Sequence, residues 1–556
     1  MNPSGAEPTR ATETAPVQRG GSRPWSWLQE RWSDVLFVAL ASALLVWVST
    51  DAFTSRIVTL SQGADYWEHS ATLRALIDDV WRPTNPHLVS PASSPRFVPP
   101  FIAAALIAKL LGLDALGAMG VASVLNLLLL LGGIFWFFRS YFHDARASLY
   151  GLVVLFTSWY DAWHFSNVYQ LKIFFSVVAY PSTAALGLSL IGFAVTLRAL
   201  RAATARGFLV ATTVCWALVM VTHPLTAMLG FTGAMLLAGT LPQVSLRQRA
   251  IVAACILGGG ILSLAWPYFS VRGVLVGGGQ QEVSALLQEF AGSGDAETTH
   301  SLHQFYWLDP LLHALGLALL GLPISLYLLV RREHFFISLG AAAMLLPFVV
   351  NAYRPLPLGH RFILLAVFFL QVGVVWLLLK LSRGSREAWT SLTAGRRGWA
   401  AGALIATVLL TTSWWNITAA RERVESAHRR LRGMESPNVR YARRISELAG
   451  ADSVVLGDAQ SSWPVPTFGP KVVVLWHGNP LVRDEAERGA RVKQFFHPRT
   501  ADSTRLEIIR QYGVTHVLAK RRLAARVQRF LARTSTRNAL PAGYSLYTVQ
   551  VTTPAG

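Results

Sequence analysis

Two clusters of acidic and histidine side chains, both rich in tryptophan and tyrosine, are the residues best suited to chemistry. The first contains Asp65, Glu68 and His69, and the second contains Asp161 and His164. A carboxylate in such a cluster could take a proton from an acceptor hydroxyl, while the aromatic rings could stack on a sugar or anchor helices at a membrane interface. The alternative is that both clusters are interfacial aromatic residues with solvated charges.

The same side chains are also possible ligands for a divalent cation. Asp65 and Asp161 could share an ion if their segments meet in the fold, and Glu68, His69 and His164 could complete its coordination. The sequence contains no close-spaced ligand pair with a specific metal geometry. It therefore leaves metal binding open.

A third group of polar residues lies just before an apolar run. Arg354, His360 and Arg361 precede the run 363–379, so the Arg361 guanidinium is expected at the edge of the hydrocarbon layer. There it could hold a lipid phosphate through charge-assisted hydrogen bonds. Alternatively, its side chain only extends toward the lipid headgroups, as long basic side chains commonly do.

The composition indicates that lipid surrounds most of the chain. Of the 556 residues, 52% are hydrophobic and only 14% are charged, and the mean hydropathy is +0.39. The apolar residues form long runs of nearly bilayer length. The formal net charge of +20 does not indicate nucleic-acid binding, because the Lys and Arg residues concentrate in short loops and in the tails. The positive-inside rule and anionic headgroups account for many of them there.

The basic loops predict a topology of about eleven membrane-spanning helices. Loops that contain Arg198, Arg247 and Arg331 are expected on the cytoplasmic side, together with the N-terminal tail. Successive loops alternate between the two sides of the membrane only if one apolar run does not cross it. We expect this to be 97–113, which has two prolines near its start, is interrupted by a lysine and is short for a span. It would be an interfacial helix in the first outer loop, residues 52–118.

The composition divides the chain into three parts. Residues 1–33 are expected to form a disordered cytoplasmic tail, 34–416 a membrane domain, and 417–556 an α/β domain outside the cytoplasm. The strands expected in this last domain are short and apolar and lie at 453–457, 471–476 and 514–518. The whole chain is thus expected to be a multi-pass protein of the cell (inner) membrane with a cytoplasmic N-terminus.

Several of these features together resemble the membrane-embedded glycosyltransferases of the C fold (GT-C), in particular bacterial relatives of protein O-mannosyltransferases and of the lipid A aminoarabinose transferase. In that superfamily an acidic residue opens the first outer loop and is followed by an amphipathic helix and by a second interfacial helix that begins with Pro-Pro. Asp65 and Pro99-Pro100 are similar to these features, and Arg361 with the residues after it is similar to a late Arg-Tyr-Leu-Leu-Pro element. The resemblance covers residues 35–379.

The resemblance implies an inverting glycosyltransferase that moves a sugar from a polyprenyl-phosphate carrier to an acceptor on the outer face of the membrane. Asp65 would be the catalytic base, Arg361 with His360 or Arg354 would hold the phosphate, and the other residues of the two clusters would contact substrate. The partners implied are the lipid-linked sugar, membrane lipid and an acceptor glycan, lipid or protein of the cell envelope. The Trp-Trp-Asp-Tyr-Gly sequence of oligosaccharyltransferases is absent, which argues against transfer of a whole oligosaccharide.

Two other classes of protein fit the same sequence: a transporter or flippase for a lipid-linked sugar, and a non-catalytic membrane scaffold of the cell envelope. A transporter would favour internal repeats and ionisable residues in mid-span, and neither is evident. The arrangement in space discriminates between an enzyme and a scaffold. An enzyme would bring Asp65, His69, Asp161 and Arg361 to one outward-facing cavity, whereas a scaffold would leave them scattered.

Overall fold

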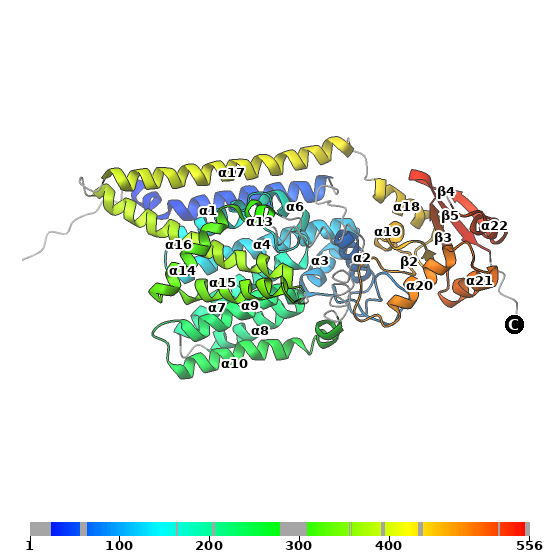
Figure 1. Cartoon of the computed structure of the whole chain (residues 1–556), viewed down its shortest axis with the longest axis horizontal. Helices are drawn as coiled ribbons and strands as arrows, with labels where there is room; N and C mark the ends of the chain where they lie inside the picture. The colour runs from blue at the N-terminus through cyan, green and yellow to red at the C-terminus, as the bar shows by residue number, and fades with distance from the viewer. Residues whose placement is uncertain are drawn as a thin grey trace, which may run out of the picture.

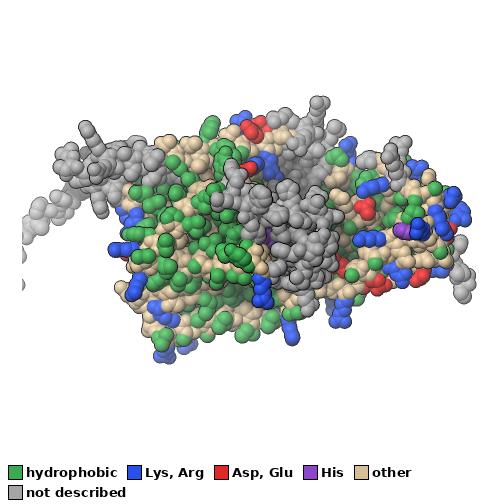
Figure 2. All heavy atoms as spheres, in the orientation of Figure 1, with side chains coloured by type: hydrophobic (Ala, Val, Ile, Leu, Met, Phe, Trp, Pro, Cys, Tyr) green, Lys and Arg blue, Asp and Glu red, His purple; other side chains and the backbone are tan. Residues whose placement is uncertain are grey.

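The computed structural model is a bundle of helices with a small α/β domain at one end (Figure 1). It describes residues 24–55, 64–162, 165–202, 206–277, 308–354, 356, 358–390, 395–431, 437–520 and 523–550. Among these residues, five helices are long and apolar enough to cross a membrane, and shorter apolar helices accompany them. Hydrophobic side chains cover the visible flank of the bundle, and Lys and Arg side chains gather toward its ends and over the domain (Figure 2). These features are those of a multi-pass membrane protein.

The helices of the bundle and of the segments beside it are, in chain order, α1 (Pro24–Thr50), η1 (Asp51–Ser55), α2 (Ala64–Asp78), α3 (Pro99–Leu110), α4 (Ala115–Phe142), α5 (Arg146–Thr157), α6 (Leu171–Val177), α7 (Pro181–Arg201), α8 (Arg206–Thr222), α9 (Pro224–Thr240), α10 (Leu246–Ser263), α13 (Leu308–Leu315), η2 (Gly316–Leu320), α14 (Gly321–Arg331), α15 (Phe335–Asn351), η3 (Gly359–Arg361), α16 (Phe362–Thr390) and α17 (Gly395–Leu431).

The α/β domain contains α18 (Pro437–Ala449), β1 (Val454–Leu456), α19 (Ala459–Ser462), η4 (Val465–Phe468), β2 (Lys471–Val472), α20 (Glu485–Phe496), α21 (Asp502–Gln511), β3 (His516–Lys520), α22 (Ala525–Thr534), β4 (Ser535–Ala539), η5 (Pro541–Gly543) and β5 (Tyr544–Val549). Its five strands are ordered β2-β1-β3-β5-β4. The pairs that involve β1 are parallel, and β5 is antiparallel to both of its neighbours. The α/β class expected for this part of the chain is confirmed.

Several predicted boundaries differ from the structure. The apolar run 174–197 is not one helix, because Pro181 lacks a backbone N–H and starts a new helix, α7, after α6. The run 311–330 is interrupted at Gly316, whose φ is +49° and where a Cβ atom would lie 2.8 Å from the Ser158 carbonyl oxygen. Of the predicted tail 1–33, residues 24–33 are helical, and the rest lies outside the described residues.

The α17 helix continues to Leu431, so the predicted domain boundary at 416 falls inside a helix. In the domain, the predicted strand 471–476 is shorter, because only Lys471 and Val472 pair with β1. The strands β4 and β5 were not predicted. Four of the five β4 side chains are polar or charged, and none of the five is fully buried, so this edge strand has no apolar alternation to mark it.

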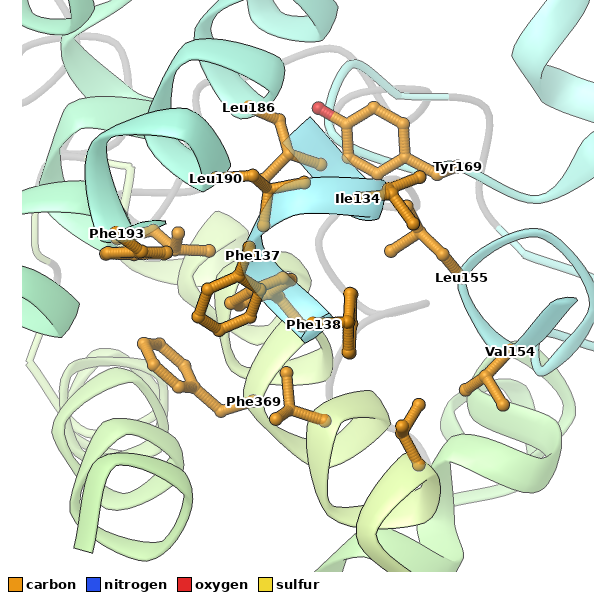
Figure 3. Close-up of a cluster of buried hydrophobic side chains, with 14 of the residues drawn as sticks. Ile134, Phe137, Phe138, Val154, Leu155, Tyr169, Leu186, Leu190, Phe193 and Phe369 are labelled. Atoms are coloured by element: carbon orange, nitrogen blue, oxygen red, sulfur yellow. The ribbon is translucent and has the colours of Figure 1, made fainter. Parts of the chain in front are cut away.

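Phenylalanine rings and close helix crossings fix the centre of the bundle (Figure 3). The ring of Phe137 on α4 lies 5.3 Å from that of Phe193 on α7, within a large buried apolar cluster. The two helices approach so closely that a Cβ atom added to Gly133 would be 2.6 Å from the Gly187 carbonyl oxygen. Small residues at such crossings are typical of helix packing in membranes.

Contacts of arginine side chains mark one end of the bundle. Arg139 near the end of α4 binds Asp34 of α1 at 2.8 Å, and Arg383 of α16 binds Asp144 at 3.0 Å. Arg201 at the end of α7 donates to the Ser140 carbonyl oxygen at 3.0 Å. We call this the basic end. The opposite end, where α2, α3 and the α/β domain lie (Figure 1), is called the domain end.

The expected non-crossing helix corresponds to α3. It is only 12 residues long, has proline in its first turn, and buries Phe101, Ala104 and Ala108. Its contacts are mainly with α2 and α4. At its C-terminal end Leu110 is 85% exposed. The length agrees with an interfacial helix, and its position relative to the lipid remains a prediction.

The α/β domain is bonded to the segment between α2 and α3. The Val472 backbone N–H donates to the His87 carbonyl oxygen at 2.7 Å, beside a parallel bridge between Leu88 and Val472. The Lys471 Nζ donates to the Asn85 carbonyl oxygen at 2.6 Å. This segment therefore continues the sheet of the domain at its β2 edge.

Candidate active site

The first turns of α2 place the first acidic cluster at the domain end of the bundle. Asp65 and Glu68 are three residues apart and His69 follows, so the three side chains leave neighbouring positions on one side of the helix. An acidic residue in the first turn is also stabilised by the positive end of the helix dipole. The Asp65 side chain is 44% exposed and that of Glu68 only 9%. Asp65 is thus the more accessible of the two acids.

Glu68 is held by an arginine from the segment that precedes α3. Arg96 Nε donates to Glu68 Oε1 at 2.8 Å and Arg96 Nη2 to Glu68 Oε2 at 3.3 Å. Burial alone would raise the pKa of the Glu68 carboxyl, but Arg96 and His477 hold it well below its usual range. Glu68 is therefore an ionised carboxylate whose charge is compensated inside the protein.

His477 reaches the two carboxylates from the α/β domain, where it lies in the loop after β2. Its Nδ1 is 3.0 Å from Asp65 Oδ1 and 3.6 Å from Glu68 Oε2. Burial would lower the pKa of His477, but hydrogen bonds and charge from the two acids raise it to about 9. Burial would likewise raise the pKa of Asp65, and the hydrogen bond from His477 lowers it instead. At neutral pH an imidazolium therefore bridges two carboxylates.

His69 follows Glu68 on α2, is buried and remains neutral. Burial lowers its pKa to about 4, and the positive charge of Arg96 acts in the same direction. Its ring packs against Phe101 and Tyr180, with centroid distances of 5.2 and 4.7 Å. Its Nδ1 is buried and has no hydrogen-bond partner among the described residues. His69 is thus a neutral group of the site that has an unused polar atom.

Arg361 acts on the same region from η3, at the start of the long α16. Its guanidinium lies 5.6 Å from the centroid of the Phe165 ring, and its Nε is buried without a hydrogen-bond partner in the described part of the chain. Burial lowers the pKa of His223, in the turn between α8 and α9, to about 3, and the charges of Arg96 and Arg361 lower it further, while Asp65 opposes them. No described contact joins Arg361 to Asp65, Glu68 or His477, so a shared site for Arg361 and the acidic cluster remains a prediction.

The remaining predicted residues lie elsewhere or cannot be placed. Asp161 is 59% exposed and forms an ion pair with Lys172 at 3.0 Å, and no described contact joins it to Asp65. His164 lies outside the described residues. Arg354 is exposed, and His360 is half-buried next to Arg361 in η3. The functional roles suggested for these four residues remain predictions.

Asp65, Glu68 and His477 also form a possible metal site. Each offers one ligand atom, and the three atoms lie within 4.8 Å of one another. Two carboxylates and an imidazole are a ligand set that divalent transition metals accept, and carboxylates also suit Mg²⁺ and Mn²⁺. Protonated His477 donates a hydrogen bond from Nδ1 to Asp65. Once deprotonated, the same Nδ1 can bind a cation. The group could thus hold the divalent cation that the sequence left open, with His477 as a ligand that the sequence did not reveal.

Two site residues, Arg96 and His477, were not predicted from the sequence. Arg96 lies 28 residues after Glu68 in an irregular segment, where nothing in the local pattern indicates that the chain turns back. His477 belongs to the separate α/β domain. One signal was available: it follows the carboxyl end of a parallel strand, where functional loops of α/β folds gather.

The chain is similar in structure to the oligosaccharyltransferase of Archaeoglobus fulgidus. The crystal structure of its apo form aligns with a TM-score of 0.55 and 11% identity over 89% of this chain and 70% of that one. Its structure tethered with an acceptor peptide that contains the NVT sequon aligns with a TM-score of 0.56 and 11% identity over 94% and 74%. ArnT from Cupriavidus metallidurans, bound to undecaprenyl phosphate, has a TM-score of 0.49 and 16% identity over 96% and 100%.

The likeness lies in the fold and not in the sequence. No protein-family model matches the sequence, and no curated protein is similar to it. At 11% identity, a shared arrangement of helices over most of both chains reports architecture only. The comparison therefore shows that this chain has a fold like that of the oligosaccharyltransferase, which agrees with the fold implied by the resemblance in the sequence.

Proposed function

We propose that this protein is an inverting glycosyltransferase that moves a sugar from a polyprenyl-phosphate carrier to an acceptor at the outer face of the membrane. The proposal rests on the exposure and the negative charge of Asp65. It is a half-exposed carboxylate at the domain end of a GT-C bundle, and its neighbour Glu68 is buried and already neutralised by Arg96. Asp65 also accepts a hydrogen bond from His477, but 44% of its side chain remains exposed to a substrate. The proposed topology places the domain end outside the cytoplasm and the basic end inside.

Asp65 has one oxygen suited to each of two tasks. Its Oδ1 accepts the hydrogen bond from His477, which leaves Oδ2 for an acceptor hydroxyl. In the proposed reaction the hydroxyl proton passes to Asp65 while the hydroxyl oxygen bonds to the anomeric carbon. The bond from that carbon to the phosphate oxygen breaks, and its electron pair leaves with the polyprenyl phosphate. A single displacement of this kind inverts the anomeric centre.

Arg361 is the proposed stabiliser of the departing phosphate. Its buried Nε lacks a hydrogen-bond partner among the described residues, and a guanidinium can bind two phosphate oxygens at once. The N–H groups of Arg361 would therefore stabilise the negative charge that develops on the phosphate as it leaves. The membrane location of the bundle fits a donor with a polyprenyl tail.

Asp65, Glu68 and His477 would be the ligands of a divalent cation, if the enzyme uses one. A bound cation would supply positive charge to the donor phosphate. The protein would still have to position the acceptor hydroxyl at Asp65. The ligand set suits more than one metal, and the proposal holds with or without a cation.

The experiment replaces Asp65 with asparagine, which keeps the size of the side chain but removes the base. Purified protein is incubated with a polyprenyl-phosphate sugar, and release of polyprenyl phosphate is measured beside the surface glycans of cells that carry each variant. Loss of one base typically lowers the rate by roughly 10²- to 10⁴-fold. Asp78→Asn, on the same helix and also exposed, is the matched control. Unchanged glycans at normal protein abundance in Asp65→Asn cells would refute the assignment.

The same assay separates the enzyme from a transporter. A flippase would move the intact lipid-linked sugar across vesicles and would release no polyprenyl phosphate. A transferase would release it only when an acceptor is present or, slowly, to water.

A further inference from the structure

The α/β domain carries a dense group of basic side chains at the end that points away from the bundle. Between Lys493 and Arg537 the sequence has eleven Lys or Arg residues and only two Asp or Glu residues. Helices α21 and α22 of this segment lie at the far end of the domain (Figure 1), where Lys and Arg side chains are numerous in Figure 2. This charge therefore does not lie against the membrane that holds the bundle.

One part of this surface is a hollow of about 440 Å³ at the end of α20. Its lining consists of Lys493, Gln494, His497, Arg499 and Thr500. Lys493, His497 and Arg499 are all exposed. The hollow thus presents several hydrogen-bond donors and two positive charges to solvent.

A buried arginine fixes the turn that shapes the hollow. Arg505 is fully buried and donates to the carbonyl oxygens of Phe495, His497 and Thr500 at 2.8 to 2.9 Å. It also forms an ion pair with Asp502 at 2.9 Å. A guanidinium with this many partners holds the turn in one conformation. The hollow is therefore preorganised and not a chance arrangement of surface side chains.

A stripe of arginines on α22 continues from the hollow. Arg526, Arg529 and Arg533 are exposed on one side of the helix, and Val527 and Phe530 are buried on the other. At 1.5 Å per residue the three arginines span roughly 10 Å. Arg533 joins the two parts, because it binds Asp502, the first residue of α21, at 2.5 Å.

The two acidic residues of this segment do not neutralise the surface. Asp502 already compensates Arg505 and Arg533, and Glu507 pairs with Arg491 at 3.5 Å. No described carboxylate pairs with Arg526 or Arg529. The positive potential of the hollow and the stripe therefore remains available to a ligand from solution.

We propose that this surface binds a linear polysaccharide of the cell envelope whose repeat units carry carboxylate groups. The surface consists of Lys493, His497, Arg499, Arg526 and Arg529, and we call it the basic strip. A polymer suits it better than a single anion, because the hollow and the stripe are separate points of positive charge along one path. Its place at the far end of the domain favours a polymer over the lipid headgroups of the same membrane. This binding does not depend on the reaction proposed for Asp65.

The test uses the full-length protein in detergent at low ionic strength. Binding of polygalacturonate, which carries carboxylates, and of polyphosphate is measured beside neutral dextran, monomeric galacturonate, inorganic phosphate, and vesicles that contain phosphatidylglycerol. The variants are Lys493→Ala/Arg499→Ala for the hollow and Arg526→Ala/Arg529→Ala for the stripe. The matched control, Arg440→Ala/Arg483→Ala, removes two exposed arginines elsewhere on the same domain.

Polygalacturonate should bind, and its affinity should fall about tenfold in each strip variant, since each variant loses two charge-assisted contacts. The control should stay within about twofold of wild type, and binding should weaken as salt screens the charges. Binding of polyphosphate without binding of polygalacturonate would overturn the proposal, because polyphosphate is not a polysaccharide. Equal losses in the control, equal affinity for the monomers, unchanged binding in both strip variants, or strip-dependent binding to vesicles with none to polymers would each overturn the proposal. Melting curves of all variants should overlap, because every substituted side chain is exposed.

Discussion

The Glu68–Arg96 ion pair provides a direct test of how the site is built. Glu68→Gln keeps the shape of the side chain but removes its charge. The glutamine faces Arg96 Nε at 2.8 Å and His477 Nδ1 at 3.6 Å, so two cationic groups lose a buried partner. Among the described residues, Asp65 is then the carboxylate that remains paired with His477.

The size of the effect follows from burial. Removal of one partner from a fully buried ion pair costs about 3 to 5 kcal/mol, because the other charge is left uncompensated. The Glu68 side chain is 9% exposed, but that of Arg96 is 32% exposed, so water can partly solvate the guanidinium after the change. Two hydrogen bonds to a charged group contribute roughly 1.5 to 3 kcal/mol each in favourable cases. We therefore expect Glu68→Gln to lower the free energy of unfolding by about 2 kcal/mol, which is less than the cost at a fully buried ion pair.

Thermal unfolding of the purified protein in detergent measures this loss. Glu68→Gln should melt about 2 °C below wild type, and Asp78→Asn, which removes an exposed acid from the same helix, should not. Arg96→Gln should lower the melting temperature similarly. In the double variant Glu68→Gln/Arg96→Gln the effect should be clearly smaller than the sum of the two single effects. A double variant whose effects simply add would show that the pair is not coupled, and the reasoning would fail.

Three other changes test different parts of the structure. Arg361→Ala should weaken binding of polyprenyl phosphate in a lipid-binding assay without lowering the melting temperature, and wild-type affinity would exclude the phosphate role. A membrane-impermeant maleimide should label Ser503→Cys in intact cells but label Arg247→Cys only after permeabilisation; the reverse pattern would invert the proposed topology. Burial lowers the pKa of Lys471 to about 8, so the folded state binds fewer protons than the unfolded state between pH 8 and 10. Stability relative to Lys471→Met should therefore rise across this range.

The parts of the site that the sequence reveals are those that local spacing determines. Asp65, Glu68 and His69 lie within one and a half turns of a helix, so their common side follows from helix geometry alone. Arg361 is recognisable because it stands where a polar segment meets an apolar run. The broad division into bundle and α/β domain follows from composition, since long apolar runs indicate a lipid environment and the more polar C-terminal segment with short apolar strands indicates an aqueous one.

The parts that the sequence hides depend on tertiary contacts. Nothing near His477 distinguishes it from a surface histidine until the α/β domain is placed against α2. Asp161 shows another dependence on tertiary structure: its residue type suggested a second half of the site, and in the structure its carboxylate pairs with Lys172, eleven residues later in the chain, so its role remains a prediction. A nearby cation can satisfy an acid more easily than a distant partner, and residue types alone do not reveal which is present.

The contacts around His477 imply that the α/β domain is part of the site and not an appendage. Asn479, two residues after His477, donates from Nδ2 to the Ser93 carbonyl oxygen at 3.0 Å, three residues before Arg96. The ring of Trp463 stacks on His87 at a centroid distance of 4.5 Å and lies 6.0 Å from His477. The loop that carries His477 and the segment that carries Arg96 are thus fixed to each other. Any movement of the domain would displace the imidazole and the guanidinium together, and both groups compensate the carboxylates of α2. The domain must therefore be docked for Asp65 to have its present protonation and orientation.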